Sequence, residues 1–170
     1  MDEKLKPAVS AMIDGLEATL IEFRDQISMV VAPEKIVEAC RILHDNFHFD
    51  MLLDETAVDY WPQETPRFNI IYQVYSMKEN LIIGLRTSLV GIHPHIQTIE
   101  GIYPNANWHE REIWDMFGIY FDGHSDLRRI LMPHGWEGFP LRKDYPLGYE
   151  EVQFTFNSDE INLHKPYAKE

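Results

Sequence analysis

Apolar residues recur every three to four positions in two stretches near the start of the chain, the spacing of one buried helix face. The first stretch predicts a helix over residues 11–26. After a short β-rich run at residues 27–31, Pro33 suits the first turn of a second helix that ends near Phe47. The residues of the two stripes are Met12, Leu16, Leu20 and Phe23, then Ile36, Ala39, Cys40 and Leu43.

Three runs rich in β-branched and aromatic residues follow, as is typical of strands. They cover residues 51–60, 68–77 and 81–89, and the first is the weakest because its centre is acidic. The short polar connection at residues 78–80 indicates a hairpin and therefore antiparallel pairing. We predict an α+β fold, a small, mostly antiparallel sheet with helices packed on one face, followed by an extended C-terminal arm.

A charged helix is predicted over residues 108–117. Asn107 suits its N-cap, and Glu110, three residues later, completes a capping box. Gly118 suits the residue that follows the last turn. Because this helix carries four charged residues in one short span, it is the first candidate for a functional site.

Ion pairs are expected to join this helix to the segment after it. Arg111 and Asp115 are four residues apart and can pair on one face. Glu112 shares a stripe with apolar residues, so we expect it to be partly buried and paired with Arg128 or Arg129. The expected network comprises Glu110, Arg111, Glu112, Asp115, His124, Arg128 and Arg129.

From residue 133 the chain is too rich in Pro and Gly for a helix, yet it keeps many large apolar side chains. Such an arm either docks on a partner protein or straps its own domain, and both alternatives stay open. We divide the chain into an α+β domain at residues 1–132 and an extended arm and tail at residues 133–170. The candidate interface residues are Trp136, Phe139, Leu141, Arg142, Lys143, Asp144 and Tyr145.

Composition excludes several classes of function. The chain has 170 residues, enough for one folded domain, and a net charge of −13. That charge argues against binding to nucleic acid or to an anionic membrane surface. The single cysteine, Cys40, excludes an intrachain disulfide, a four-cysteine zinc site and an ordinary iron–sulfur centre, and we expect it in the core.

No complete catalytic motif is present. His109-Glu110 would begin the zinc motif H-E-x-x-H, but position 113 is Ile113. Nucleotide-binding glycine loops and the G-x-S-x-G elbow are missing from the sequence. A metal-dependent enzyme using His93, His95, His109 or Glu112 is a remote alternative.

The charged helix and the arm together resemble one family. The pattern is Glu110-Arg111-Glu112-x-x-Asp115-Met116-Phe117, six residues, His124, three residues, then Arg128-x-Ile130-x-Met132, and later E-G-F-P-L-R-K-D-Y-P at residues 137–146. It resembles the C-type subunit, the 30 kDa subunit family, of proton-pumping NADH:quinone oxidoreductase, respiratory complex I. The resemblance covers residues 103–147, and the upstream order of helices and strands is also that of the family.

The resemblance implies a structural subunit of the peripheral arm, the quinone-reducing module, with no catalytic residue and no cofactor of its own. FMN, iron–sulfur clusters and quinone would belong to partner subunits. The partners would be the hydrogenase-like quinone-site subunit, of the D type, and neighbouring iron–sulfur subunits. The chain would reach the cytoplasmic side of the energy-transducing membrane only through the complex. The alternative is the equivalent subunit of a membrane-bound hydrogenase or of a photosynthetic or F420-linked complex.

Overall fold

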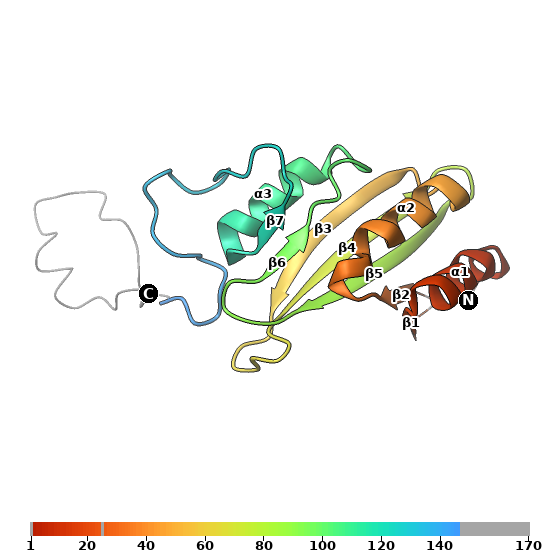
Figure 1. Cartoon of the computed structure of the whole chain (residues 1–170), viewed down its shortest axis with the longest axis horizontal. Coiled ribbons are helices and arrows are strands. Elements are labelled where there is room, and N and C mark those ends of the chain that lie inside the picture. Colours follow the sequence, from red (N-terminus) through yellow and green to blue (C-terminus); the bar gives the residue numbers. More distant parts are fainter. Residues whose placement is uncertain (1, 25, 147–170) are drawn as a thin grey trace, which may run out of the picture.

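A computed structural model describes residues 2–24 and 26–146 of the chain (Figure 1). It contains three α-helices, two short 3-10 helices and seven strands within these residues. In chain order the elements are η1 (Glu3–Leu5), α1 (Lys6–Leu16), β1 (Thr19–Phe23), β2 (Gln26–Val30), η2 (Pro33–Lys35), α2 (Ile36–Phe47), β3 (Met51–Asp59), β4 (Phe68–Ser76), β5 (Leu81–Leu89), β6 (His95–Gln97), α3 (Ala106–Phe117) and β7 (Tyr120–Asp122).

The centre of the fold is a five-stranded sheet with the order β1-β2-β5-β4-β3. All neighbouring strands pair antiparallel except β2 and β5, which are parallel. The hairpin of β4 and β5 keeps its register from Phe68↔Leu89 to Ser76↔Leu81, whereas β3 carries a bulge between Leu52 and Asp54. The strands β1 and β3 are therefore the two edges of the sheet.

Helices α1 and α2 cover one face of this sheet and enclose the core. Alternate residues of the central strands point to that face, among them Tyr72 of β4 and Leu85 of β5, both fully buried. Met12 of α1 and Leu43 of α2 are buried against them. Cys40 lies in the same core, which confirms its prediction as a core residue.

A smaller unit lies beyond the edge strand β3 (Figure 1). β6 and β7 pair in parallel, and α3 connects them. Two hydrogen bonds fix the loop before α3, one from the Asn105 amide to the carbonyl of Leu52 in β3 (2.8 Å) and one from the Tyr103 hydroxyl to the carbonyl of Phe49, just before β3 (2.8 Å). α3 is therefore held at a fixed place along the sheet edge.

After β7, residues 123–146 form neither helix nor strand. Several backbone groups of this segment bind α3, including the amide of Leu141, which donates to the carbonyl of Met116 (3.1 Å). The rest of the predicted arm and tail, residues 147–170, lies outside the described residues. Among the described residues, no helix has both the length and the apolar composition needed to cross a membrane.

The predicted fold class is confirmed, and the three predicted strands correspond to β3, β4 and β5. The helix predicted over residues 11–26 is wrong in its second half. It ends at Leu16, Glu17 takes a left-handed φ of 57°, and Thr19–Phe23 forms β1. Leu20 and Phe23 are three residues apart, so they share a helix face but lie on opposite faces of β1. Thr19 and Ile21 are β-branched and suit a strand, and β1 pairs with β2 along its whole length.

Candidate functional site

The carboxylate of Asp115, at the buried side of α3, binds the segment that leads into the arm. Its Oδ2 accepts three consecutive backbone N–H groups, from Ile130 (3.0 Å), Leu131 (2.8 Å) and Met132 (2.9 Å). Its Oδ1 accepts from the guanidinium of Arg129. Burial alone would raise the pKa of this carboxyl, but these hydrogen bonds together hold it below its usual value. Asp115 is thus ionised and fixes the path of the chain.

Arg129 joins α3 to the following part of the arm. The side chain is largely buried, and Nη2 donates to the carbonyls of Trp136 (2.9 Å) and Gly138 (3.2 Å). Its guanidinium carbon lies 5.7 Å from the ring centres of both Trp114 and Phe139. Because one guanidinium contacts a carboxylate, three carbonyls including that of Asp115, and two rings, Arg129 is the centre of the contacts between α3 and the arm.

The four-residue spacing predicted that Arg111 pairs with Asp115, but the two side chains do not pair. Arg111 donates instead to the carbonyls of Arg128 (3.1 Å) and Arg129 (3.2 Å). The reason is that Asp115 is already saturated by Arg129 and by backbone amides. Arg128 lies at the surface and pairs with Asp126 (2.8 Å).

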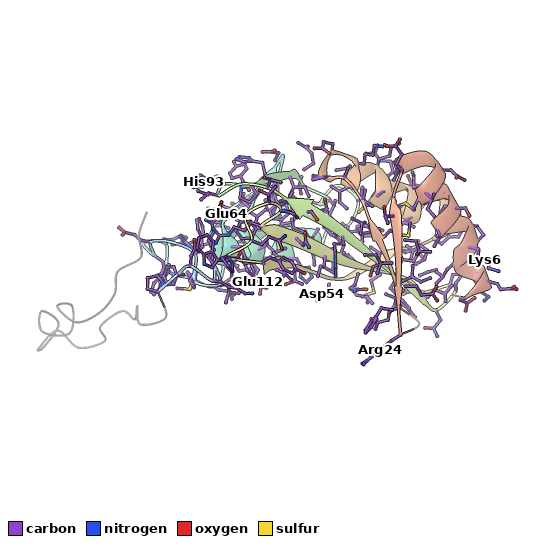
Figure 2. All side chains as sticks on the ribbon, turned by 90° about the horizontal axis from the view of Figure 1, so that it is seen from below. Lys6, Arg24, Asp54, Glu64, His93 and Glu112 are labelled. Carbon is purple, nitrogen blue, oxygen red and sulfur yellow. The ribbon has the colours of Figure 1, made fainter. Side chains whose placement is uncertain are left out.

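The predicted pairing of Glu112 with Arg128 or Arg129 is wrong. Glu112 is exposed, and among the described residues it has no hydrogen bond or ion pair. Figure 2 labels Glu112 on α3, toward the opposite end of the molecule from Lys6 of α1. The stripe that it shares with Trp108 faces outward, since that tryptophan is also exposed.

Glu110 has no capping role, because α3 begins at Ala106 and the predicted capping box does not form. Its carboxyl is buried and accepts from the Thr98 hydroxyl and from the amide of Ile99 (2.8 Å). Burial raises the pKa of Glu110 to about 7, against the opposing effect of these hydrogen bonds. Glu110 therefore anchors α3 to the loop that follows β6.

His124 is held in one tautomer beside Glu110. Its Nδ1 accepts from the amide of Asp126 (3.0 Å), so Nε2 carries the proton and donates to the carbonyl of Asn107 (3.1 Å). Nε2 lies 3.8 Å from Oε2 of Glu110. The ring thus connects the start of the segment after β7 to the first turn of α3.

A second buried carboxyl, Glu55 of β3, lies near Glu110. Neither oxygen has a hydrogen-bond partner among the described residues. Burial raises its pKa well above the usual value, and the charges of Glu110 and Asp54 add to that effect. Glu55 therefore favours its protonated form more strongly than an ordinary glutamate does.

Arg142 fastens the far end of the described arm. It donates to the carbonyls of Phe117 and Ile92 (2.9 Å), and its guanidinium lies 4.7 Å from the ring centre of Phe139. Burial lowers its pKa, and the nearby charge of Arg67 lowers it further. The carbonyl at residue 117 can accept this bond because α3 ends there.

Gly118 permits this close approach. Its φ is +70°, a left-handed value that disfavours other residues. A Cβ at this position would lie 2.6 Å from Cζ of Phe139 and 2.7 Å from Nη2 of Arg142. The arm therefore packs against bare backbone at the end of α3.

A second ion cluster joins the arm to the sheet, and two of its members were missed by sequence reasoning. Arg67 binds both oxygens of Asp59 (3.0 and 2.9 Å) and both oxygens of Asp144 (3.1 and 2.6 Å). Asp59 also accepts from the amide of Lys143 (2.9 Å). Burial would raise the pKa of Asp59, but Arg67 and two backbone amides lower it overall. The sequence offers one indication of this cluster, namely that Asp59 ends β3 and the oppositely charged Arg67 directly precedes β4.

The other candidate interface residues lie on the outer side of the arm or along it. Leu141 and Lys143 are exposed. Trp136 is half-buried, and the Tyr145 hydroxyl donates to the carbonyl of Glu137 (3.5 Å). Their contacts with a partner stay a prediction.

A groove of about 540 Å³ opens between the arm and two loops of the sheet. Trp61 lines one side, the exposed Val90 and Ile92 line another, and Phe139 and Arg142 lie on the arm side. Because the groove combines apolar side chains with a cation, it suits binding of a protein segment.

The histidines named for the metal alternative are dispersed. His95 lies 3.2 Å from Asp122, His109 lies 3.9 Å from Asp54, and His93 borders the groove. Within the described part of the chain, no three His, Cys, Asp or Glu side chains are grouped so that they could hold a metal ion. The ion pairs of the site hold the arm against α3 and the sheet.

Comparison with solved structures finds the same fold in two chains. One is the trypsin-resistant fragment (1-134) of Nqo5, with a TM-score of 0.66, 22% identity and coverage of 73% of this chain and 99% of that chain. The other comes from the membrane-bound sulfane sulfur reductase, an archaeal respiratory membrane complex, with a TM-score of 0.68, 24% identity and coverage of 86% and 87%.

Sequence relatives are closer. The C-type subunit of NADH-quinone oxidoreductase from Roseiflexus sp. (strain RS-1) is 46% identical over 170 residues, which cover 99% of this chain and 95% of the relative. The C-type subunit numbered 2 from Rhizobium meliloti (strain 1021) is 49% identical over 135 residues, which cover 78% and 73%. Residues 29–151 match the family described as "Respiratory-chain NADH dehydrogenase, 30 Kd subunit". The chain thus belongs to the family of the 30 kDa, or C-type, subunit of respiratory-chain NADH dehydrogenase.

Proposed function

We propose that the chain is a structural subunit of the peripheral arm of a proton-translocating NADH:quinone oxidoreductase. It contributes shape and no catalytic group, and it supports the quinone-site subunit of the complex. FMN, the iron–sulfur clusters and the quinone belong to partner subunits. The chain lies on the cytoplasmic side of the membrane through its partners. This proposal rests on membership of the family together with the geometry of α3 and the arm.

The carrying observation is that the buried charges of the site bind the backbone of the arm and of the segment just before it. Asp115 and Arg129 together engage three amides and three carbonyls of the chain, one of them Asp115's own. Groups used in this way are saturated and are poorly placed for acid–base chemistry. They hold the arm in one path, as a docking surface requires.

Large apolar side chains are exposed on α3, on the segment after it and on the arm. Trp108 of α3 is 60% exposed, Leu131 is 61% exposed and Leu141 is 53% exposed. Large apolar groups held on a fixed backbone are typical anchors of a protein interface. We assign residues 133–170 to a docking arm and residues 1–132 to the domain that carries it. The described contacts of the arm with its own domain are compatible with docking, because they leave these side chains outside.

The test is affinity purification of the tagged full chain from its own membranes in mild detergent, followed by mass spectrometry. We expect the hydrogenase-like quinone-site subunit and iron–sulfur subunits to co-purify with the wild-type chain. Leu131→Gln and Leu141→Gln should each reduce the recovery of all these partner subunits. Ile13→Gln on α1, also an exposed apolar residue, is the matched control and should leave recovery unchanged. Full recovery with both the Leu131→Gln and the Leu141→Gln variants would contradict docking through this surface.

A further inference from the structure

The second face of the five-stranded sheet, opposite α1 and α2, is bare. We call it the open face and define it by five residues in register, one per strand, Thr19, Val30, Arg86, Ile71 and Thr56, with the outward residues beside them. Among the described residues, no helix packs across it, and α3 borders it only along β3. Arg24, at the turn that ends β1, projects away from the helices in Figure 2.

Large apolar side chains are exposed on the open face. Ile21, Phe23, Met51 and Ile82 have exposed fractions between 41 and 65%. Met51 and Ile82 both lie beside Tyr75 in the register, so part of this surface is continuous across three strands. A contiguous apolar surface of this kind on one side of a sheet is characteristic of a binding face.

A cation stands at the centre of this surface. Arg86 lies on β5 between Val30 and Ile71, and its Nε is buried without an acceptor among the described residues. It has no ion pair with any described residue, although the chain carries 28 acidic residues against 15 basic ones. The two terminal nitrogens of Arg86 are not among the buried atoms, and a partner's carboxylate can bind them with two parallel hydrogen bonds.

Two further charges lie at the margins of the open face, one of each sign. Arg24 lies over the ring of Phe23, 5.1 Å from its centre, at one end of the face. The acid Asp54 lies at the far edge strand, 3.9 Å from His109. A second copy of this chain is a poor partner, because it has the same net charge of −13. In a two-fold contact centred on this face, the Arg86 side chains of the two copies would also lie close together and repel each other.

We propose that the open face is a second docking surface, which binds a protein partner through a segment that presents a carboxylate among apolar side chains, with the carboxylate on Arg86. This surface uses neither α3 nor the arm, and it therefore goes beyond the function proposed above. Arg86 selects the partner by charge, and the apolar residues around it supply the contact area.

The experiment places a photo-cross-linking amino acid, p-benzoylphenylalanine, at Ile82 of the tagged full chain and scores adducts in the assembled complex. We expect one cross-linked protein of the complex, with an Asp or Glu close to the attached residue. Arg86→Glu should lower the cross-linking yield at least tenfold, Arg86→Gln should lower it less, and Arg86→Lys should keep it within about twofold. Thermal denaturation of each variant separates loss of docking from loss of folding.

Three outcomes would overturn the proposal. They are adducts with a second copy of the chain, adducts with lipid or none at all in an assembled complex, and a yield that Arg86→Glu and Arg86→Gln leave unchanged. The same probe at Ile13 on α1 is the control position. Failure of arm docking would remove the complex itself, whereas failure of the open face would remove only the adduct, so the two are distinguishable.

Discussion

Replacing Asp115 by alanine should release the start of the arm from α3. The change removes the acceptor of three backbone amides and the partner of Arg129, whose side chain is only 12% exposed. Breaking a buried ion pair by removing one partner costs about 3–5 kcal/mol. Each amide left without an acceptor adds to the loss, by less where the residue is exposed, as Ile130 and Leu131 are. We therefore expect a loss of about 3–5 kcal/mol in the free energy of unfolding.

The assay is urea denaturation at pH 7 of the wild type, Asp115→Ala, Arg129→Met and the double variant. The cycle should give a coupling energy of about 2–3 kcal/mol, because the two side chains are in direct contact. Since its hydrogen bonds lower the pKa of Asp115, this stabilisation is present above about pH 4 and is lost as the pH falls through the lowered value.

Glu112→Ala is the matched control, since Glu112 is an exposed carboxylate on the same helix with no ion pair to any described residue. It should change the stability by no more than about 0.5 kcal/mol. A coupling near zero between Asp115 and Arg129, or an equal loss in Glu112→Ala, would refute the assignment of Asp115 as the anchor of the arm.

Three further changes test groups buried around α3. Burial raises the pKa of Glu110 from 4.5 to about 7, so between these pH values the folded protein keeps a proton that the unfolded chain releases. The free energy of unfolding of the wild type, measured by urea denaturation, should therefore fall by about 3 kcal/mol as the pH rises through this window, and that of Glu110→Gln should not. Glu55→Met removes a buried carboxyl with two unpartnered oxygens and should raise the free energy of unfolding at pH 7 by about 1–3 kcal/mol in the same assay. Gly118→Ala forces a Cβ against Phe139 at a left-handed φ, and tryptic cleavage after Arg142 should become about tenfold faster.

Each of these predictions has a result that contradicts it. Equal pH slopes in the wild type and Glu110→Gln would assign the titration to another group. A less stable Glu55→Met protein would mean that the carboxyl is favourable where it lies. Gly15→Ala, where an added Cβ meets nothing within 4 Å, is the control for Gly118, and equal cleavage rates in the two alanine variants would show that the arm tolerates the side chain.

Local patterns were sufficient for the hairpin of β4 and β5, where alternation and a short polar turn agree. They were insufficient at residues 17–26, where the apolar spacing fits a helix but the pairing of β1 with β2 decides for a strand. The end of α3 at Gly118 was predictable because a left-handed residue after a helix is a local feature.

The partners of the charges could not be predicted in the same way. Spacing along the helix suggested Arg111 for Asp115, yet the buried carboxylate accepts backbone groups from a segment without regular structure. In the second cluster, Arg67 binds Asp144, which lies 77 positions further along the sequence. Neither periodicity nor spacing carries information on such contacts, because they depend on how the arm returns to the sheet.

The binding of three successive amides by Asp115 has an evolutionary consequence. Amide groups are common to all residues except proline, so the carboxylate recognises the course of the main chain and not the identity of its side chains. Ile130 and Leu131 are exposed beside these bonds and can be replaced without breaking them. Substitutions there can change the affinity for a neighbouring protein while the backbone of residues 130–132 keeps its conformation. Proline is the one residue at these positions that cannot make the same contacts.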